Sequence, residues 1–459
     1  MIPGRGQAAW SAVDVRAAGC LAVWKRAGRA LADPEVLDRT NVTGVPDMTA
    51  SETSLPITRM QQVGLIMVML ACFTEALTVA FNIGAIMTRF DASGAEAGFV
   101  ATAQGLCVAL AALTGTRLIA RQTARSLVAI GLVLVAAGHA LAILATSVVM
   151  MAAFQAIGGL GTGLVVCVVM ATAARTPKPE MTYGLINGSV GAYLSVLALT
   201  VPKVLAFGGF TAAYGFYAIL ALAGLLWLPA VPNTRAPKTS GAPVDAAAGA
   251  SEQRAVGKPA GWIALVGMGV LFCSIAGMGA FIERIGVKAE ISLQTIGWAF
   301  FGGGLLTIVG PISAGIVGAR FGSTRPLVLL GALICVAAFG LAVDGAMLSY
   351  LISVPLWIVL PAVLMPFFLG GLAVVDPSGK LAGAHPAFAT LGGSMGPLTA
   401  GALADAAGYR TLGWIVVAAV IAALTLMAFA TRRADKIRVT EAKLIVGALG
   451  NVGKGIAMS

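Results

Sequence analysis

Residues 62–86 read QVGLIMVMLACFTEALTVAFNIGAI, and this stretch decides the fold class. Glu75 is the one charged residue among its 25 positions. About 20 consecutive apolar residues in a helix cross the ~30 Å hydrocarbon core of a bilayer. The remainder of the 459-residue chain has the same character, because 58% of its residues are hydrophobic and 11% are charged, whereas a soluble chain carries about 25% charged residues. The sequence therefore predicts an all-α membrane protein with many spans.

Further apolar runs of similar length follow at regular intervals. We expect twelve transmembrane helices, at about 62–86, 96–118, 126–146, 148–172, 181–206, 208–232, 261–283, 293–318, 326–346, 348–375, 382–406 and 411–431. A polar stretch separates the sixth helix from the seventh. The two sets, 61–232 and 261–432, have equal length and short internal connections. We interpret them as two pseudo-symmetric six-helix bundles, rather than twelve unrelated helices. A disordered tail (1–60), a linker (233–260) and a second tail (433–459) complete the chain.

Lys and Arg are distributed unevenly over the predicted connections. With a cytoplasmic N-terminus, 25 of the 30 basic residues fall in cytoplasmic segments. Cytoplasmic loops of membrane proteins collect these residues, so we expect both termini to be cytoplasmic and the protein to lie in the cytoplasmic (inner) membrane. The same bias accounts for the net charge of +11 without a nucleic-acid partner.

Several kinds of chemistry lack the residues that they need. The six cysteines are widely spaced and the chain has two histidines, so no metal-ligand pattern or disulfide framework is indicated. Neither a P-loop nor the motif HExxH is present, which argues against ATP-driven chemistry and against a metalloprotease. We predict a protein that is not an enzyme, has no cofactor or metal, and is a monomer.

Three stretches carry motifs of a known family. They are Gly315-Ile-Val-Gly-Ala319-Arg320-Phe-Gly322-Ser-Thr-Arg325 after the eighth helix, Gln155-Ala-Ile-Gly158-Gly159-Leu-Gly161-Thr-Gly163 in the fourth, and Gly392-Gly-Ser-Met-Gly396-Pro397-Leu-Thr-Ala400-Gly401 in the eleventh. Together with the arrangement of six plus six helices, these motifs resemble those of the major facilitator superfamily. The resemblance covers about residues 60–432.

This resemblance implies a transporter whose two bundles open a central cavity alternately to each side of the membrane. It assigns a gating role to the loop residues Gly315, Arg320, Gly322 and Arg325, and to Gly396 and Pro397 of the eleventh helix. The chain departs from the family pattern at two positions. Ala319 replaces an expected acid, and Gln155 stands where many proton-coupled members place an arginine. These departures weaken an antiporter assignment and favour uptake or proton symport, while the direction of transport stays open.

Glu75 is the candidate proton-coupling residue. It lies midway along the first predicted helix, and no Lys or Arg lies deep in any predicted span. An ionisable group inside the membrane is costly and usually marks a transport pathway or a proton relay. In the family that the chain resembles, an acid at this level of the first helix often couples protons or receives a cationic substrate. The alternative is a permanently protonated carboxyl group that bonds a neighbouring helix.

Thr78 and Asn82 follow Glu75 at i+3 and i+7, so all three share one face of the first helix. We predict that they line a cavity together with Gln104, Gln155, Asn187 and Tyr193, although each of these also suits an interhelical hydrogen bond. A phosphorylated or dicarboxylate substrate would call for a central Arg or Lys. We therefore expect a small neutral, amphipathic or weakly cationic organic substrate.

Three other polar residues are interpreted as structural. His139 could shuttle protons, but in the family that the chain resembles this helix usually sits peripherally, so we expect a packing histidine. Glu283 and Arg284, adjacent opposite charges at the end of the seventh helix, are expected to be solvated at the membrane interface.

The function that follows is secondary active transport by alternating access, coupled to protons. Two alternatives remain open. One is efflux of drugs or toxic compounds by the same fold, and the other is a transporter-like sensor that binds ligand without turnover.

Overall fold

The fold comes from a computed structural model that describes residues 57–119, 121–233, 258–342, 347–376 and 380–457. The described residues belong to one compact unit, Leu55–Ser459. The predicted tail 1–60 and linker 233–260 lie almost wholly outside them, so both stay predictions. Side chains within 309–321 and 441–457 are likewise outside the description.

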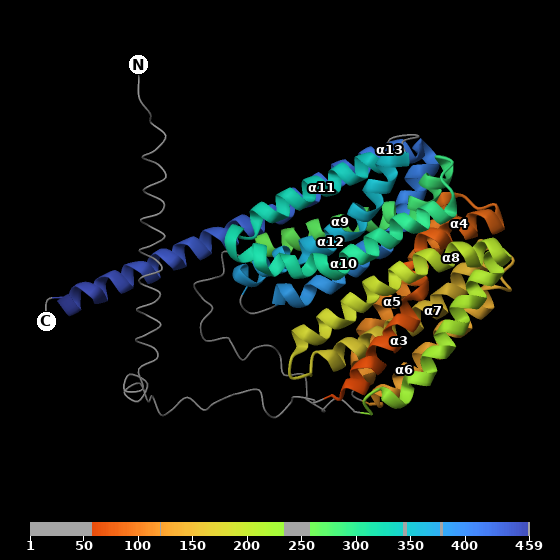
Figure 1. Cartoon of the computed structure of the whole chain (residues 1–459), viewed down its shortest axis with the longest axis horizontal. Coiled ribbons are helices and arrows are strands. Elements are labelled where there is room, and N and C mark those ends of the chain that lie inside the picture. The colour runs from red at the N-terminus through yellow and green to blue at the C-terminus, as the bar shows by residue number, and fades with distance from the viewer. Residues whose placement is uncertain (1–56, 120, 234–257, 343–346, 377–379, 458–459) are drawn as a thin grey trace, which may run out of the picture. The chain divides into compact units, whose positions relative to one another are not determined.

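All secondary structure in these residues is helical (Figure 1). In chain order the elements are α3 (Arg59–Leu77), α4 (Val79–Phe90), α5 (Gly94–Ile119), α6 (Ala124–Ala142), α7 (Val148–Ala173), α8 (Pro179–Gly224), the 3-10 helix η1 (Leu225–Ala230), α9 (Lys258–Lys288), α10 (Leu293–Phe321), α11 (Thr324–Ala342), α12 (Met347–Val375) and α13 (Lys380–Ala457). Hydroxyl side chains cap several starts: Thr58, Thr123, Ser147 and Ser292 each accept a hydrogen bond from a first-turn N–H.

Nine of the described helices are long and apolar enough to cross a membrane. Two of these apolar stretches, Met181–Ala230 and Ala384–Ile437, have 50 and 54 residues. Each is interrupted by glycine with a positive φ, Gly209 at 59° in α8 and Gly408 at 78° in α13. Only glycine adopts such conformations readily. The predicted class is confirmed, and the chain is a multi-pass helical membrane protein. The count of twelve spans stays a prediction.

The first predicted helix is in fact two. α3 ends at Leu77 and α4 begins at Val79, with Thr78 between them at φ −110° and ψ 18°. Nothing local in the sequence predicts this break, because the segment contains neither proline nor glycine at that point.

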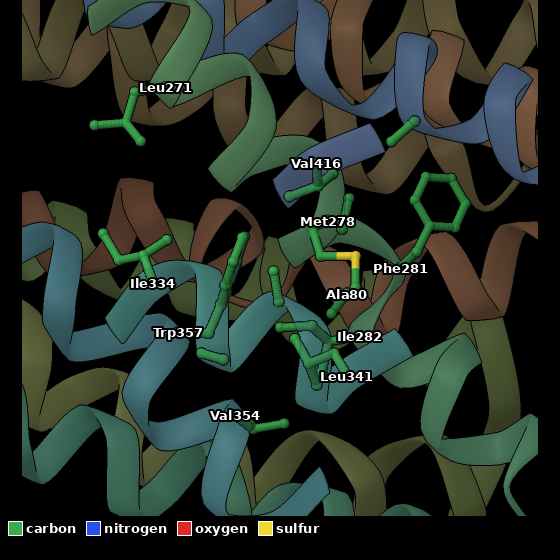
Figure 2. Packing of buried hydrophobic residues seen from close by; sticks show 14 of the residues in the cluster. Ala80, Leu271, Met278, Phe281, Ile282, Ile334, Leu341, Val354, Trp357 and Val416 are labelled. Carbon is green, nitrogen blue, oxygen red and sulfur yellow. The ribbon is translucent and has the colours of Figure 1, made fainter. Parts of the chain in front are cut away.

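The apolar core forms two clusters. The smaller gathers side chains of α3, α6 and α7 within the first half of the chain, and the larger joins helices of both halves. Figure 2 shows part of the larger cluster, including Ala80 of α4, Met278 of α9 and Trp357 of α12. The two halves, 59–230 and 258–457, pack together mainly through α5 with α13, α8 with α10 and α4 with α9.

Candidate functional site

The break at Thr78 is stabilised by polar side chains. Asn82 Nδ2 donates to the carbonyl oxygen of Glu75 at 3.0 Å. The Tyr217 hydroxyl of α8 donates to Asn82 Oδ1 at 2.7 Å and accepts from Thr78 Oγ1 at 3.1 Å. All four residues are buried. A backbone carbonyl freed inside a membrane needs such a partner, so the three side chains together keep the helix discontinuous.

The Glu75 carboxyl group lies immediately before this break and is 4% exposed. Gln104 of α5 donates from Nε2 to Glu75 Oε2, and Gln155 of α7 donates from Nε2 to Oε1 at 3.1 Å. No Lys or Arg pairs with Glu75 within the part of the chain that the structure describes. Two neutral amides therefore take the place that a cation fills in an ordinary buried ion pair.

His139 extends this group of bonds. Its Nδ1 lies 3.3 Å from Gln155 Oε1, and its ring packs against those of Tyr214 and Tyr217. His139 is 2% exposed and packed, as the interpretation of a packing histidine expects, but Gln155 also places it two hydrogen bonds from Glu75. We call Glu75, Gln104, Gln155 and His139 the Glu75 cluster.

A central cavity of about 570 Å³ lies between the two halves. Its wall includes Leu77 and Gln104 from the first half and Phe272, Trp357 and Pro397 from the second. The wall is largely apolar, and no charged side chain lines it among the described residues. A cavity of this size accommodates a small organic molecule.

Gln104 connects the cavity to the Glu75 cluster. Its side chain forms part of the cavity wall and also donates to Glu75, which does not itself line the cavity. A bound molecule would therefore meet the Gln104 amide first. The buried carboxyl group would respond to it through that amide.

The other predicted lining residues divide into two groups. Thr78, Asn82 and Gln155 join the hydrogen bonds around Glu75 but are not in the cavity wall. Tyr193 bonds Thr74 Oγ1 at 2.9 Å, and Asn187 is exposed on α8, away from these bonds. The sequence analysis did not single out four polar residues that do line the cavity: Thr162, Trp357, Thr390 and Ser394. Nothing in their spacing distinguishes them from other residues of apolar helices.

The predicted gating motif is only partly described. Gly315 and Arg320 fall in α10, where side chains lie outside the description, while Gly322 ends that helix with φ 73° and Arg325 is exposed. Gly396 packs against the backbone of α9. Pro397 lines the central cavity.

Glu283 is buried rather than solvated, which corrects the expectation for the end of the seventh helix. It is 6% exposed, and its Oε2 has no hydrogen-bond partner among the described residues. The carboxyl group lies against Gly84 of α4, where a Cβ atom would overlap it. Arg284 donates to the Gly84 carbonyl oxygen and to Thr88 Oγ1, the latter at 2.7 Å. This pair therefore joins α9 to α4 across the two halves.

Two helical halves around a shared, largely apolar cavity define the chain as a multi-pass membrane protein with the architecture of a transporter. The family model of the Major Facilitator Superfamily matches residues 63–378, and the chain belongs to this family. The resemblance expected from the motifs is thereby confirmed, and the protein is a membrane transporter of this superfamily.

Solved structures agree on the fold. The nucleoside transporter NupG has 12% identity and a TM-score of 0.64, with 81% of this chain and 99% of that chain covered. A mutant of the peptide transporter POT has 16% identity and a TM-score of 0.64, covering 84% and 98%. A bacterial homolog of the human lysosomal transporter Spinster, in an inward-facing and unoccupied conformation, has 15% identity and a TM-score of 0.63, covering 82% and 97%. At these identities the likeness concerns the fold alone. No curated protein sequence matches the chain.

Proposed function

We propose that this protein moves a small neutral, amphipathic or weakly cationic organic compound across the cytoplasmic membrane by alternating access, coupled to protons. The observation that carries the proposal is the pairing of an uncharged apolar cavity with a buried acid behind its wall. Gln104 belongs to both. The cavity suits an uncharged or weakly charged ligand, and the acid supplies a group that can take up and release a proton.

The chemistry of the cluster supports Glu75 as the proton carrier. A protonated carboxyl group donates a hydrogen bond, whereas an ionised one only accepts. Both amides donate to Glu75 in this structure, and a proton added to Glu75 would gain an acceptor if one of these amides turned and presented its oxygen. Turning Gln104 changes the cavity wall. Proton uptake by Glu75 and ligand binding in the cavity would thus both depend on the Gln104 side chain.

The direction that we propose is uptake by symport, with both termini cytoplasmic. Gln155 supports it, because it fills the position at which many proton-coupled family members are expected to carry an arginine, and here it bonds the acid directly. Among the described residues no Lys or Arg pairs with Glu75, whereas an exchange mechanism would favour a cation that stabilises the ionised acid after its proton leaves.

Reconstituted vesicles test the proposal. Protein in liposomes that contain a pH-sensitive dye is exposed to a panel of neutral and weakly cationic amphipathic compounds. We expect compound-dependent proton entry in the wild type and none in Glu75→Gln. Glu96→Gln is the matched control, because Glu96 is an exposed acid on α5, and it should retain proton entry.

Substrate flux and proton entry that persist unchanged in Glu75→Gln would contradict the role of Glu75. Ligand binding by the purified protein without accumulation in sealed vesicles would instead indicate a sensor. Proton movement opposite to that of the compound would indicate efflux.

A further inference from the structure

A groove of about 300 Å³ runs between α11 and α13 in the second half of the chain. Val328, Ala332 and Cys335 of α11 form one wall, and Ile421, Thr425 and Ala428 of α13 form the other. The groove is hollow because several of these residues, Ala332, Thr425 and Ala428 among them, have short side chains at the line where the two helices meet.

The groove faces lipid. Val328 is 46% exposed and Ile421 is 54% exposed, and both are apolar side chains on helices apolar enough to cross a membrane. In a bilayer such side chains contact acyl chains.

One end of the groove is basic. Arg432 is part of its lining and is exposed, and no hydrogen bond or ion pair to its guanidinium occurs within the described residues. Arg325 and Lys436 are also exposed. The acid in this region, Asp435, accepts hydrogen bonds from the backbone N–H groups of Ser323 and Thr324, both at 3.0 Å.

The hydrogen bonds of Asp435 also fix the position of α13 relative to α11. They tie α13 to the first residues of α11, so Arg325 on α11 and Arg432 on α13 lie at the same end of the helix pair. From Arg432 to Ile421 the helix rises about 16 Å, which is about half of the ~30 Å hydrocarbon core. With Arg432 at the membrane surface, the groove would extend to about the middle of the bilayer, the depth of one leaflet.

We propose that this groove binds an anionic phospholipid, with the phosphate at Arg432 and one acyl chain lying between α11 and α13. Guanidinium groups bind phosphate oxygens with paired, charge-assisted hydrogen bonds, and basic pockets between membrane helices are known sites for anionic headgroups. Arg325 and Lys436 add positive charge around the headgroup. The site lies on the lipid-facing side of the second half, apart from the central cavity.

Native mass spectrometry of the purified full-length protein tests the site. Dioleoyl-phosphatidylglycerol and dioleoyl-phosphatidylcholine, which share acyl chains and differ in headgroup charge, are titrated separately. We expect tighter binding of phosphatidylglycerol. Arg432→Gln should weaken that binding about fivefold, the effect of about 1 kcal/mol for one cation near a membrane surface, and leave phosphatidylcholine unchanged.

Thr425→Phe fills the groove from its exposed wall and should weaken binding of both lipids. Two matched controls should bind as the wild type does. Arg117→Gln removes an exposed cation at the end of α5, and Val133→Phe enlarges an exposed side chain on α6.

Equal affinity for phosphatidylglycerol in Arg432→Gln and the wild type would overturn the proposal. An equal loss in Arg117→Gln would also overturn it, because the charge effect would then belong to the whole surface. Displacement of the lipid by inorganic phosphate alone would do the same, because the headgroup would then suffice without the groove. None of these outcomes depends on transport activity.

Discussion

At the scale of single residues, Glu75 is defined by the direction of its hydrogen bonds. Gln155 donates to Glu75 through its nitrogen and faces His139 Nδ1 with its oxygen. If Gln155 turned to accept from a protonated Glu75, its nitrogen would face His139, which would then need an unprotonated Nδ1. The protonation state of Glu75 and the tautomer of His139 are therefore linked through the Gln155 amide.

This linkage predicts the stability of Gln155→Leu. The substitution leaves a buried oxygen of Glu75 and a buried nitrogen of His139 without partners, so we expect the free energy of unfolding to fall by about 1–3 kcal/mol. Glu75→Leu should cost less in the Gln155→Leu background than in the wild type. Thermal unfolding in detergent of the two single variants and the double variant measures both effects. Strictly additive losses would mean that Glu75 and Gln155 are not coupled.

At the scale of elements, the two halves are held together where α5 meets α13. Asp405 accepts from the N–H groups of Gly94 and Ala95, at 2.9 and 2.7 Å, at the start of α5. Acids are stabilising at helix N-termini because of the helix dipole. Further along, Thr102 Oγ1 accepts from the Leu398 N–H at 3.3 Å. By the predicted orientation this is the outer half of the membrane.

Close backbone contact at this interface predicts the effect of Gly98→Ala. A Cβ atom on Gly98 would overlap the carbonyl oxygen of Pro397, which is backbone and cannot turn aside. We expect the variant to separate α5 from α13 and to favour the state open to the outside. A cysteine at Ala101, which lines the central cavity, reports the change when it is labelled by an impermeant thiol reagent in a variant without native cysteines.

Gly188→Ala is the control for this experiment, since nothing lies within 4 Å of the Cβ position there. It should leave the labelling rate of the Ala101→Cys protein unchanged. A Gly98→Ala variant that labels no faster than this control would show that the α5–α13 contact does not hold the outer side closed.

Some features of these elements followed from the sequence and others did not. Apolar length placed α5 and α7 within two residues of their observed ends. Helical spacing predicted one shared face for Glu75 and Asn82, whereas in the structure Asn82 bonds the backbone carbonyl oxygen of Glu75 across a break in the helix. The break at Thr78 was not predictable, because Tyr217, a residue of α8 far along the chain, helps to stabilise it. Burial of Glu283 likewise depends on the absence of a side chain at Gly84 in the other half, a contact that no local pattern reveals.

At the scale of the whole molecule, the lengths of the two long apolar stretches indicate how many times each one crosses the membrane. A straight helix of 50 residues would extend about 75 Å, more than twice the ~30 Å core, so we predict that Met181–Ala230 crosses the membrane twice. Phe207 lies next to the Gly208–Gly209 kink and is 93% exposed, as expected at a turn outside the core. The same argument applies to Ala384–Ile437 around Gly408.

The turns near Phe207 and Arg410 would then lie on the same side of the membrane. This arrangement predicts which single cysteines an impermeant reagent labels. With native cysteines replaced, Phe207→Cys and Arg410→Cys should react with an impermeant maleimide added outside intact cells, whereas Arg121→Cys should react only after the cells are opened. The positive charge at Arg121 and its neighbours in the same connection would then face the cytoplasm. Protection of Phe207→Cys in intact cells, with labelling after opening, would reverse the orientation. Protection in both conditions would place Phe207 within the membrane and contradict the double crossing of α8.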